Sequence, residues 1–381
     1  MLTFLFKVQY HHFIYSAHGP EKGTEGINLS YGADSARRST ALPPLSSLIM
    51  TDSPHYNITS NVEFLLDFVI AGFAKTGTTT LARNFFHSHP EIVLPRAEVH
   101  LLTKNEPPGK LVQLMYELDK SAAAAAVALP GRNKVIRGYK APRDIGSFHV
   151  LDIYDTYFPN AKLIVGLRHP IEWFHSFYNF KLRDKKSSMP LPELLDGECL
   201  LEMKAGEERA NHVKNKLGGL SDRGVCADLA RYHVRLSWMG KTNISDPAED
   251  VLLGPNRRYK LANRAPIRNP IFLYEVAQLG DKNMSRLSTF LNDLQQYLGL
   301  STPFTLPASP KKIAHDKEQF DICEHKYKAL REVLLKAGKE ASLWITTYFL
   351  KHPDVHVSAP DYFQTLLRRW HDDPCESTAK R

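Results

Sequence analysis

The fold is decided by one stretch of this 381-residue chain, Phe68-Val-Ile-Ala-Gly-Phe-Ala-Lys75-Thr-Gly-Thr-Thr-Thr-Leu81. Its first residues are apolar and typical of a buried strand, and the glycine and threonines that follow predict a tight turn leading into a helix. Such a turn directs backbone N–H groups at an anion, and the helix dipole adds a favourable potential. The stretch therefore predicts a phosphate-binding loop, although an ordinary turn between a strand and a helix remains the alternative.

The spacing within this loop differs from that of a Walker A motif, G-x-x-x-x-G-K-[ST]. Gly72 and Gly77 have the required separation, but Thr78 occupies the lysine position and Thr79 the hydroxyl position after it. The lysine lies three places earlier, at Lys75. A Walker lysine contacts the β- and γ-phosphates of a nucleoside triphosphate, so its displacement argues against a nucleotide kinase and favours a different phosphate ligand.

A second strand and helix carry two further candidate phosphate ligands. The apolar run Lys162–Leu167 is followed by Arg168, at the carboxyl end of an expected strand, where open α/β sheets bind their ligands. Ser176 lies two turns along the helix that Pro170 is expected to begin. An arginine fork and a serine hydroxyl can bind one phosphate from different sides. Taken alone, the two residues also fit a helix-capping arginine and a solvated serine.

Together these elements resemble the sulfotransferase family, whose members use 3′-phosphoadenosine 5′-phosphosulfate (PAPS). In that family a K-[TSG]-G-T-[TR] loop binds the 5′-phosphosulfate, and a strand-ending arginine with a serine eight positions later binds the 3′-phosphate. The segment Lys75–Thr79 and the pair Arg168 and Ser176 match both parts in the same order. The resemblance implies that PAPS is bound by Lys75, Thr76, Gly77, Thr78, Thr79, Thr80, Arg168 and Ser176.

Three more segments resemble the Golgi carbohydrate branch of this family, which includes the heparan sulfate sulfotransferases. Ala97-Glu98-Val99-His100 resembles the E-[VP]-H-F-F segment that holds the branch's general base. The segment Gly138–Pro142 resembles the E-K-[TS]-P substrate segment, and the matches together span about residues 64–350. The segment of residues 311–315 resembles the late K-G-R-x-H loop that closes over PAPS in this branch. The expected PAPS-binding residues therefore also include Lys311, Lys312, Ile313, Ala314 and His315.

The resemblance implies transfer of the sulfuryl group of PAPS to a hydroxyl or amino group of a carbohydrate, with adenosine 3′,5′-bisphosphate (PAP) as the product. Lys75 is expected to stabilise the charge on the departing 5′-phosphate. Glu98 is expected to be the general base, with His100 as the alternative, because sulfotransferases of small molecules use histidine. Lys140 is expected to contact both the carboxylate and the sulfate, and Arg143 to bind an acidic acceptor. No metal is implied, since PAPS has no triphosphate for Mg²⁺ to bridge.

Composition narrows the other classes of function. The net charge of +8 is compatible with a nucleic acid, an anionic glycan or an anionic cofactor. No zinc-finger spacing or RNP-type motif occurs, so we expect no nucleic-acid partner, and we expect the 17 histidines to be scattered surface and core residues. A small-molecule or tyrosyl acceptor, a P-loop nucleotide kinase and a noncatalytic anion-binding protein remain the alternatives. The presence of Lys75, Glu98 and Lys140 together argues against a noncatalytic anion-binding protein.

Alternating strand and helix patterns predict an α/β fold, a P-loop-like parallel sheet flanked by helices on both faces. We expect a disordered lead-in over residues 1–60, a sulfotransferase domain over 62–352 and a C-terminal tail over 353–381. Within the domain, residues 184–262 form an expected helical insertion that either lines an acceptor groove or is solvated. The expected strands are Phe64–Ala71, Glu91–Pro95, Lys134–Lys140, Lys162–Leu167 and Asn269–Glu275, and the expected helices include Thr78–His87, Phe320–Lys336 and Glu340–Leu350.

The signals of cellular location point in two directions. The apolar segment Met1–Tyr15 is shorter than the roughly 20 residues that span a bilayer, and it lacks the basic start of a secretory signal. The family resemblance implies the Golgi lumen, with membrane association through a missing or atypical anchor, whereas this N-terminus also allows a cytoplasmic enzyme. Four N-x-[ST] sequons give weak support to the lumen, at Asn28, Asn57, Asn243 and Asn283.

The four cysteines are widely spaced and define neither a disulfide scaffold nor a metal site. Cys199 and Cys226 can bridge if the chain enters an oxidising lumen.

Overall fold

The computed structural model describes residues 42–51, 56–127, 135–183, 230–242, 264–306 and 320–378. From Pro43 onward they belong to one compact unit. The expected insertion over residues 184–262 lies mostly outside the described residues, as do residues 1–41 and the pair Cys199 and Cys226. No helix within the described part of the chain has the length and apolar character needed to cross a membrane.

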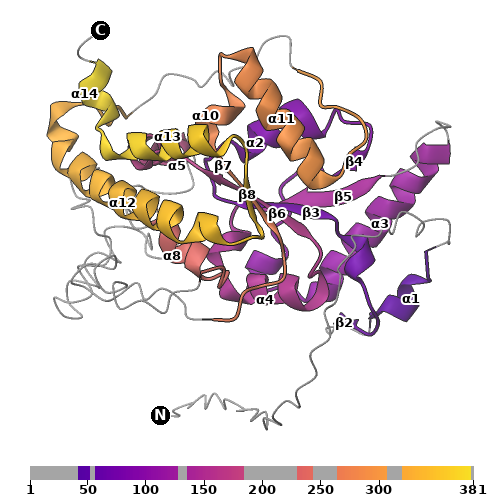
Figure 1. The fold of residues 1–381 in the computed structure, drawn as a ribbon. Coiled ribbons are helices and arrows are strands. Elements are labelled where there is room, and N and C mark those ends of the chain that lie inside the picture. Colours follow the sequence, from indigo (N-terminus) through magenta and orange to yellow (C-terminus); the bar gives the residue numbers. More distant parts are fainter. Residues whose placement is uncertain are drawn as a thin grey trace, which may run out of the picture. The chain divides into compact units, whose positions relative to one another are not determined.

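Six parallel strands form the central sheet in the order β4-β5-β3-β6-β7-β8 (Figure 1). Strand β3 lies inside the sheet, and the chain then adds β4 and β5 on one side and β6, β7 and β8 on the other. The strand order therefore reverses beside β3, which is the position where open α/β sheets bind ligands at their carboxyl edge. The bounds are β3 Phe68–Gly72, β4 Ile92–Val93, β5 Ile136–Lys140, β6 Lys162–Leu167, β7 Ile271–Glu275 and β8 Val355–Val357.

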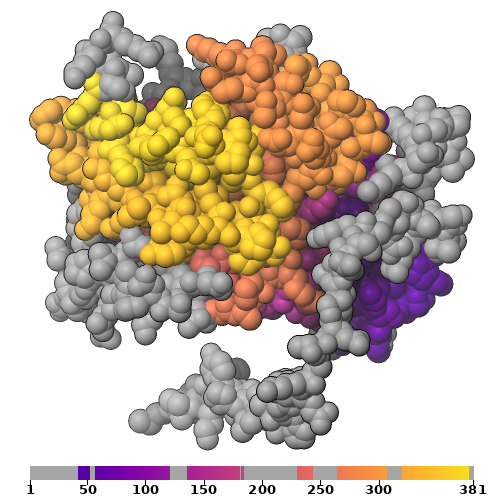
Figure 2. Space-filling view, in the orientation of Figure 1, coloured from indigo at the N-terminus to yellow at the C-terminus, as the bar shows by residue number. Residues whose placement is uncertain are grey.

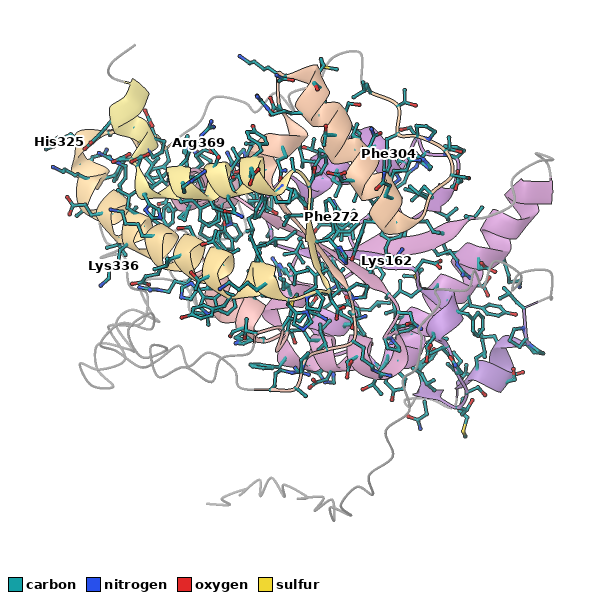
Figure 3. The ribbon with its side chains drawn as sticks, viewed as in Figure 1. Lys162, Phe272, Phe304, His325, Lys336 and Arg369 are labelled. Carbon is teal, nitrogen blue, oxygen red and sulfur yellow. A yellow bond between two sulfur atoms is a disulfide. The ribbon has the colours of Figure 1, made fainter. Side chains whose placement is uncertain are left out.

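One face of the sheet is covered by helices whose apolar side chains form a large core cluster. Phe272 on β7, labelled in Figure 3, packs edge-to-face against Phe290 of helix α11, with ring centroids 5.9 Å apart. Phe68 on β3 makes the same kind of contact with Phe86 at 5.3 Å. The elements on this face are α2 Thr78–Leu81, its π-helical continuation η2 Ala82–Phe86, α10 Val276–Leu279 and α11 Met284–Leu298.

The opposite face is covered by helix α4, Phe148–Tyr157. Tyr139 of β5 points to this face, where its hydroxyl lies 2.6 Å from that of Tyr154 on α4, and both hydroxyls donate to Asp144. Figure 1 shows α11 and α4 on opposite sides of the sheet. The expectation of a parallel sheet flanked by helices on both faces is therefore confirmed.

The C-terminal part of the chain differs from the expected tail over residues 353–381. Strand β8 extends the sheet beside β7, and it is followed by α13 Pro360–Arg368, η10 Arg369–His371 and α14 Pro374–Thr378. The two helices expected at Phe320–Lys336 and Glu340–Leu350 form a single helix, α12 Lys328–Thr347. In the view of Figure 2 these segments lie on the surface beside α11. Strand β8 has three residues, too few for a periodic pattern in the sequence.

A disulfide joins Cys323 to Cys375, which are 52 residues apart in sequence. The same two segments are joined by an ion pair in which Arg331 Nε lies 2.8 Å from Asp373 Oδ2, with both side chains almost fully buried. The spacing of the four cysteines did not predict this bridge. Cys323 lies just before α12 and Cys375 lies in α14, so the two residues are brought together by β8 and the helices that follow it.

The first described segment also differs from the expected lead-in. Helix α1, Leu45–Leu48, is followed by β1 Ile49–Met50, which pairs antiparallel with β2 Asn57–Ile58. Leu48 and Ile49 are buried. Both short strands pack against α3, Pro108–Val127, so part of the range 1–60 belongs to the folded unit.

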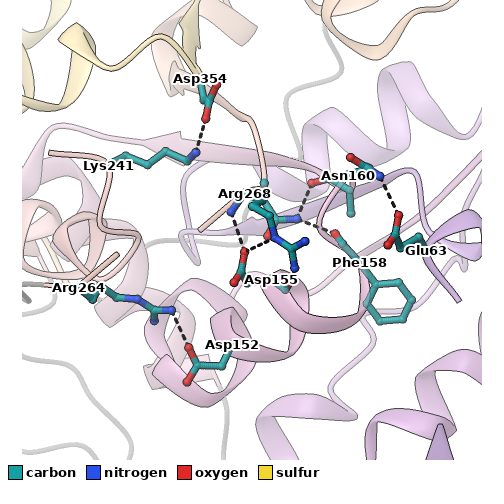
Figure 4. Close-up of polar contacts among 11 residues, drawn as sticks. Glu63, Asp152, Asp155, Phe158, Asn160, Lys241, Arg264, Arg268 and Asp354 are labelled. Atoms are coloured by element: carbon teal, nitrogen blue, oxygen red, sulfur yellow. Dashed lines mark hydrogen bonds and ion pairs between the residues drawn. The ribbon is translucent and has the colours of Figure 1, made fainter. Parts of the chain in front are cut away.

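Ion pairs hold the chain at the amino ends of β7 and β8, the edge of the sheet opposite the loop between β3 and α2 (Figure 4). Arg264 Nη2 lies 2.7 Å from Asp152 Oδ1 on α4, and the backbone N–H of Arg268 donates to Asp155 Oδ1 at 2.8 Å. The buried Lys241 lies 2.8 Å from Asp354. The contacts of Arg264 and Arg268 hold the segment that enters β7 against α4.

Candidate functional site

The loop between β3 and α2 contains two residues in the left-handed region of backbone conformation. Lys75 and Gly77 have positive φ values of 69° and 84°, and Gly77 is the residue immediately before α2. The Thr76 hydroxyl donates to the Phe73 carbonyl at 2.6 Å, and the Tyr274 hydroxyl of β7 donates to the Thr76 carbonyl at 3.1 Å. The loop is therefore held in shape by its own hydroxyl and by the neighbouring sheet.

Lys75 lies in this loop with its ammonium group close to other cations. Burial, followed by the charges of Arg183 and Arg168, lowers the pKa of Lys75 to about 8, and the charge of Glu98 opposes this shift. The ammonium nitrogen lies 4.5 Å from the ring centroid of Phe180. A half-buried cation beside two guanidinium groups indicates a place for an anion.

Arg168, directly after β6, faces the same loop. Its Nη1 donates to the Lys75 carbonyl at 3.5 Å, and its Nε lies 3.5 Å from the Glu172 carboxylate. The buried Nε forms no hydrogen bond with the described residues. Ser176 lies half-buried on α5, Pro170–Arg183, two turns beyond Arg168. The structure thus joins Arg168 to the loop and places Ser176 on the adjoining helix.

Three of the expected catalytic side chains form one connected chain with the loop. Lys140, the last residue of β5, donates from Nζ to the Thr79 hydroxyl at 3.0 Å and lies 3.1 Å from Glu98 Oε1. The other oxygen of Glu98, Oε2, lies 3.3 Å from Nε2 of His100. The Val99 N–H donates to the Lys140 carbonyl at 2.9 Å, so the two segments are also joined through their backbones.

The surroundings of His100 are basic. Burial lowers the pKa of His100, and the positive charges of Arg143 and Lys104 add to this effect, whereas Glu98 opposes it. Arg143 is itself exposed. The expected binding of an acidic acceptor by Arg143 stays a prediction.

Several residues at the site were missed by sequence reasoning. The indole Nε1 of Trp173 donates to the Ala74 carbonyl at 2.9 Å, and Phe180 lies over Lys75, both from α5. Their spacing on one face of a helix was visible in the sequence but is also typical of a core. Glu275, at the end of β7, accepts the Ala277 N–H at 2.7 Å, and burial raises its pKa to about 7.

The late segment, residues 311–315, lies outside the described residues, so its expected role over PAPS stays a prediction. Among the residues that the structure describes, no group of three or more histidine, cysteine, aspartate or glutamate side chains is placed to hold a metal ion. The described cations of the site are instead arranged around the phosphate loop.

Comparison with known proteins supports the sulfotransferase family. Residues 67–210 match the family model described as a sulfotransferase domain. This range contains the loop between β3 and α2, Glu98, Lys140 and Arg168, and the match supports sulfuryl transfer as the general activity. Sulfotransferases act in general on a hydroxyl-bearing acceptor and typically use PAPS.

The structure is also similar to the crystal structure of a sulfotransferase from Alicyclobacillus acidocaldarius. The likeness covers 74% of this chain and 96% of that one, at 16% sequence identity and a TM-score of 0.41. Similarity at this level carries no argument about activity. The curated proteins contain no significant match to the sequence.

Proposed function

We propose that the protein transfers the sulfuryl group of PAPS to a hydroxyl or amino group of a carbohydrate. The observation that carries this proposal is the contact chain in which Lys140 Nζ lies 3.0 Å from the phosphate-loop hydroxyl of Thr79 and 3.1 Å from the Glu98 carboxylate. One ammonium group thereby joins the anion-binding loop to a candidate base. Such a connection is what a transfer from a bound anion to an adjacent acceptor requires.

The described cations fit PAPS as the donor. When bound, PAPS would supply the sulfuryl group, and the electron pair of the broken sulfur–oxygen bond would stay on the 5′-phosphate. In our proposal the loop N–H groups and Lys75 bind that 5′-phosphosulfate, and Lys75 stabilises the growing charge on the bridging oxygen. Arg168 and Ser176 bind the 3′-phosphate, and the contact of Arg168 Nη1 with the Lys75 carbonyl at 3.5 Å supports this assignment.

The acceptor must lose its proton while the new oxygen–sulfur bond forms. In our proposal Glu98 is the general base that accepts this proton, and its two carboxylate oxygens are contacted by Lys140 and His100. Lys140 also neutralises the sulfate oxygens. Arg143, exposed beside this group, binds an acidic part of the acceptor.

A second candidate function is supported by one observation, the 3.3 Å separation of His100 Nε2 from Glu98 Oε2. A histidine oriented by a carboxylate is a familiar general base, in which the carboxylate positions the ring. In this version His100 takes the proton and the acceptor is a small molecule or a tyrosyl group. The two versions assign different roles to the same pair.

We further propose that the enzyme works in the Golgi lumen. The disulfide between Cys323 and Cys375 supports an oxidising compartment, because disulfides persist there and are rare in the cytosol. Of the four sequons, Asn57 is exposed on β2, and Asn283 accepts two backbone N–H groups at the start of α11. Asn57 is therefore the better glycan acceptor of these two.

The roles of Glu98 and His100 are tested by substituting each alone and measuring sulfate transfer from radiolabelled PAPS to a panel of glycans and phenols. Glu98→Gln keeps the size of the side chain and should lower turnover by roughly 10²–10⁴-fold, while PAP binding is retained. His100→Ala should have the smaller effect. If His100→Ala abolishes transfer and Glu98→Gln does not, the carbohydrate assignment is wrong and the small-molecule version is right.

A further inference from the structure

Three aromatic residues on one side of helix α5 lie along the phosphate loop. Trp173, Phe177 and Phe180 follow the i, i+4, i+7 spacing of a single helix face. Their rings form a continuous row, with centroids 5.2 Å apart for Trp173 and Phe177 and 6.4 Å apart for Phe177 and Phe180. The two ends of this row contact consecutive loop residues, Ala74 through the Trp173 indole N–H and Lys75 through the Phe180 ring.

The two contacts differ in kind. Trp173 is buried and its hydrogen bond of 2.9 Å holds the loop backbone. Phe180 is 42% exposed, so its ring is not a core side chain, and the Lys75 ammonium lies 4.5 Å from the centroid of this ring. This distance is within the range of a cation–π interaction, in which the negative face of the ring attracts the cation.

The contact with the ring matters because two neighbouring guanidinium groups repel the ammonium group. Arg168 and Arg183 both act on Lys75 as positive charges, and Glu98 is the acidic group that opposes them. Without an anion in the loop, like-charge repulsion favours rotamers that carry the ammonium group away into water. The Phe180 ring opposes this movement from the side of α5.

We propose that Phe180 is a positioning residue, whose ring holds the Lys75 ammonium beside the phosphate loop before the donor binds. A cation over an aromatic ring contacts it through one side only, so the remaining N–H groups of Lys75 stay free to donate to phosphate oxygens. The donor then meets a cation already in place and spends less of its binding energy on ordering the lysine side chain. This role rests on the proposed function, in which Lys75 binds the 5′-phosphosulfate.

The proposal is tested with phenylalanine analogues that carry one, two or three ring fluorines at position 180. Fluorination weakens the negative face of the ring while its volume stays nearly constant, so a role in packing does not respond to it. Two quantities are measured for each protein, the pKa of Lys75 by NMR of labelled lysine without ligand, and the affinity for PAP by calorimetry.

We expect a graded response to fluorination. The pKa of Lys75 should fall below the value of about 8, because the attraction that favours the charged form weakens while the burial remains. The affinity for PAP should fall by about two- to fivefold at three fluorines, the loss expected for one partly exposed cation–π contact. Phe180→Tyr should preserve both values.

A matched control is available in Phe148 on α4, which is also 42% exposed and stacks on Trp238 at 4.4 Å, outside the phosphate loop. Phe148→Ala should change neither the pKa of Lys75 nor the PAP affinity. Fluorinated proteins that keep the wild-type values of both would overturn the role of Phe180. If the unmodified protein does not bind PAP, the proposed function fails instead, and the pKa of Lys75 still tests the contact with Phe180.

Discussion

The disulfide between Cys323 and Cys375 should stabilise the protein chiefly by restricting the unfolded chain. The two cysteines are 52 residues apart, and closing a loop of that length removes about 14 cal/mol/K of chain entropy, equivalent to about 4 kcal/mol at 25 °C. In the folded protein the same segments remain joined by Arg331 and Asp373, at 2.8 Å. Native contacts should therefore survive loss of the bridge.

We expect the double substitution Cys323→Ser and Cys375→Ser to lower the free energy of unfolding by about 2–4 kcal/mol. Serine is suitable at both positions, because Cys323 is exposed and Cys375 is half-buried. Urea unfolding, followed by circular dichroism, measures the difference. Wild-type protein treated with a reductant should match the double variant, and the reductant should leave the double variant unchanged.

The reasoning is refuted if the oxidised wild type and the double variant unfold at the same urea concentration. That result would mean that the bridge does not form in solution or that it restricts nothing in the unfolded chain. The assignment to an oxidising compartment would then lose its main support.

Three other predictions follow from the described residues. Because the pKa of Lys75 is about 8 and its charged form is required, kcat/KM should fall as the pH rises through 8, and a profile flat to pH 10 would exclude this role. Burial raises the pKa of Glu275 from 4.5 to about 7. The contribution of this carboxyl to the free energy of unfolding is therefore complete below pH 4.5 and is lost as the pH rises through 7. Thermal unfolding should therefore show Glu275→Gln to be more stable than wild type by up to about 3 kcal/mol at pH 9, with little difference at pH 4.5. Gly77→Ala should weaken PAP binding in calorimetry, because φ is 84° and the new Cβ would lie 2.7 Å from Leu279; unchanged affinity would show that the loop tolerates this strain.

The sequence predicted the parts of the fold that depend on local pattern. Strand β6 was predicted with its observed bounds, Lys162–Leu167, because a buried parallel strand is a continuous apolar run. The turn before α2 was predicted because glycine at position 77 permits the positive φ that the structure has. Strand β8 was missed, since three residues beside β7 are recognised only through their partner.

In the candidate site, the residues placed by the sheet were predictable from the sequence, whereas contacts between distant segments were not. The carboxyl edge of a parallel sheet places the ends of β3, β5 and β6 together, which explains why Lys140 and Arg168 lie near the loop. The pairing of Cys323 with Cys375 and the contact of Phe180 with Lys75 depend on how distant segments pack, and no local pattern encodes them. The aromatic row on α5 was visible, but its spacing is equally typical of a buried helix face.

The central claim is that the site binds a donor with both a 5′- and a 3′-phosphate. Calorimetry of the purified protein with PAP and with AMP tests it most directly, because the two ligands differ in the 3′-phosphate that Arg168 and Ser176 are proposed to bind. PAP should bind more tightly by about 1.5–3 kcal/mol, roughly 10- to 150-fold, and Arg168→Ala should remove most of that difference. Equal affinities of the wild-type protein for PAP and AMP would contradict the account.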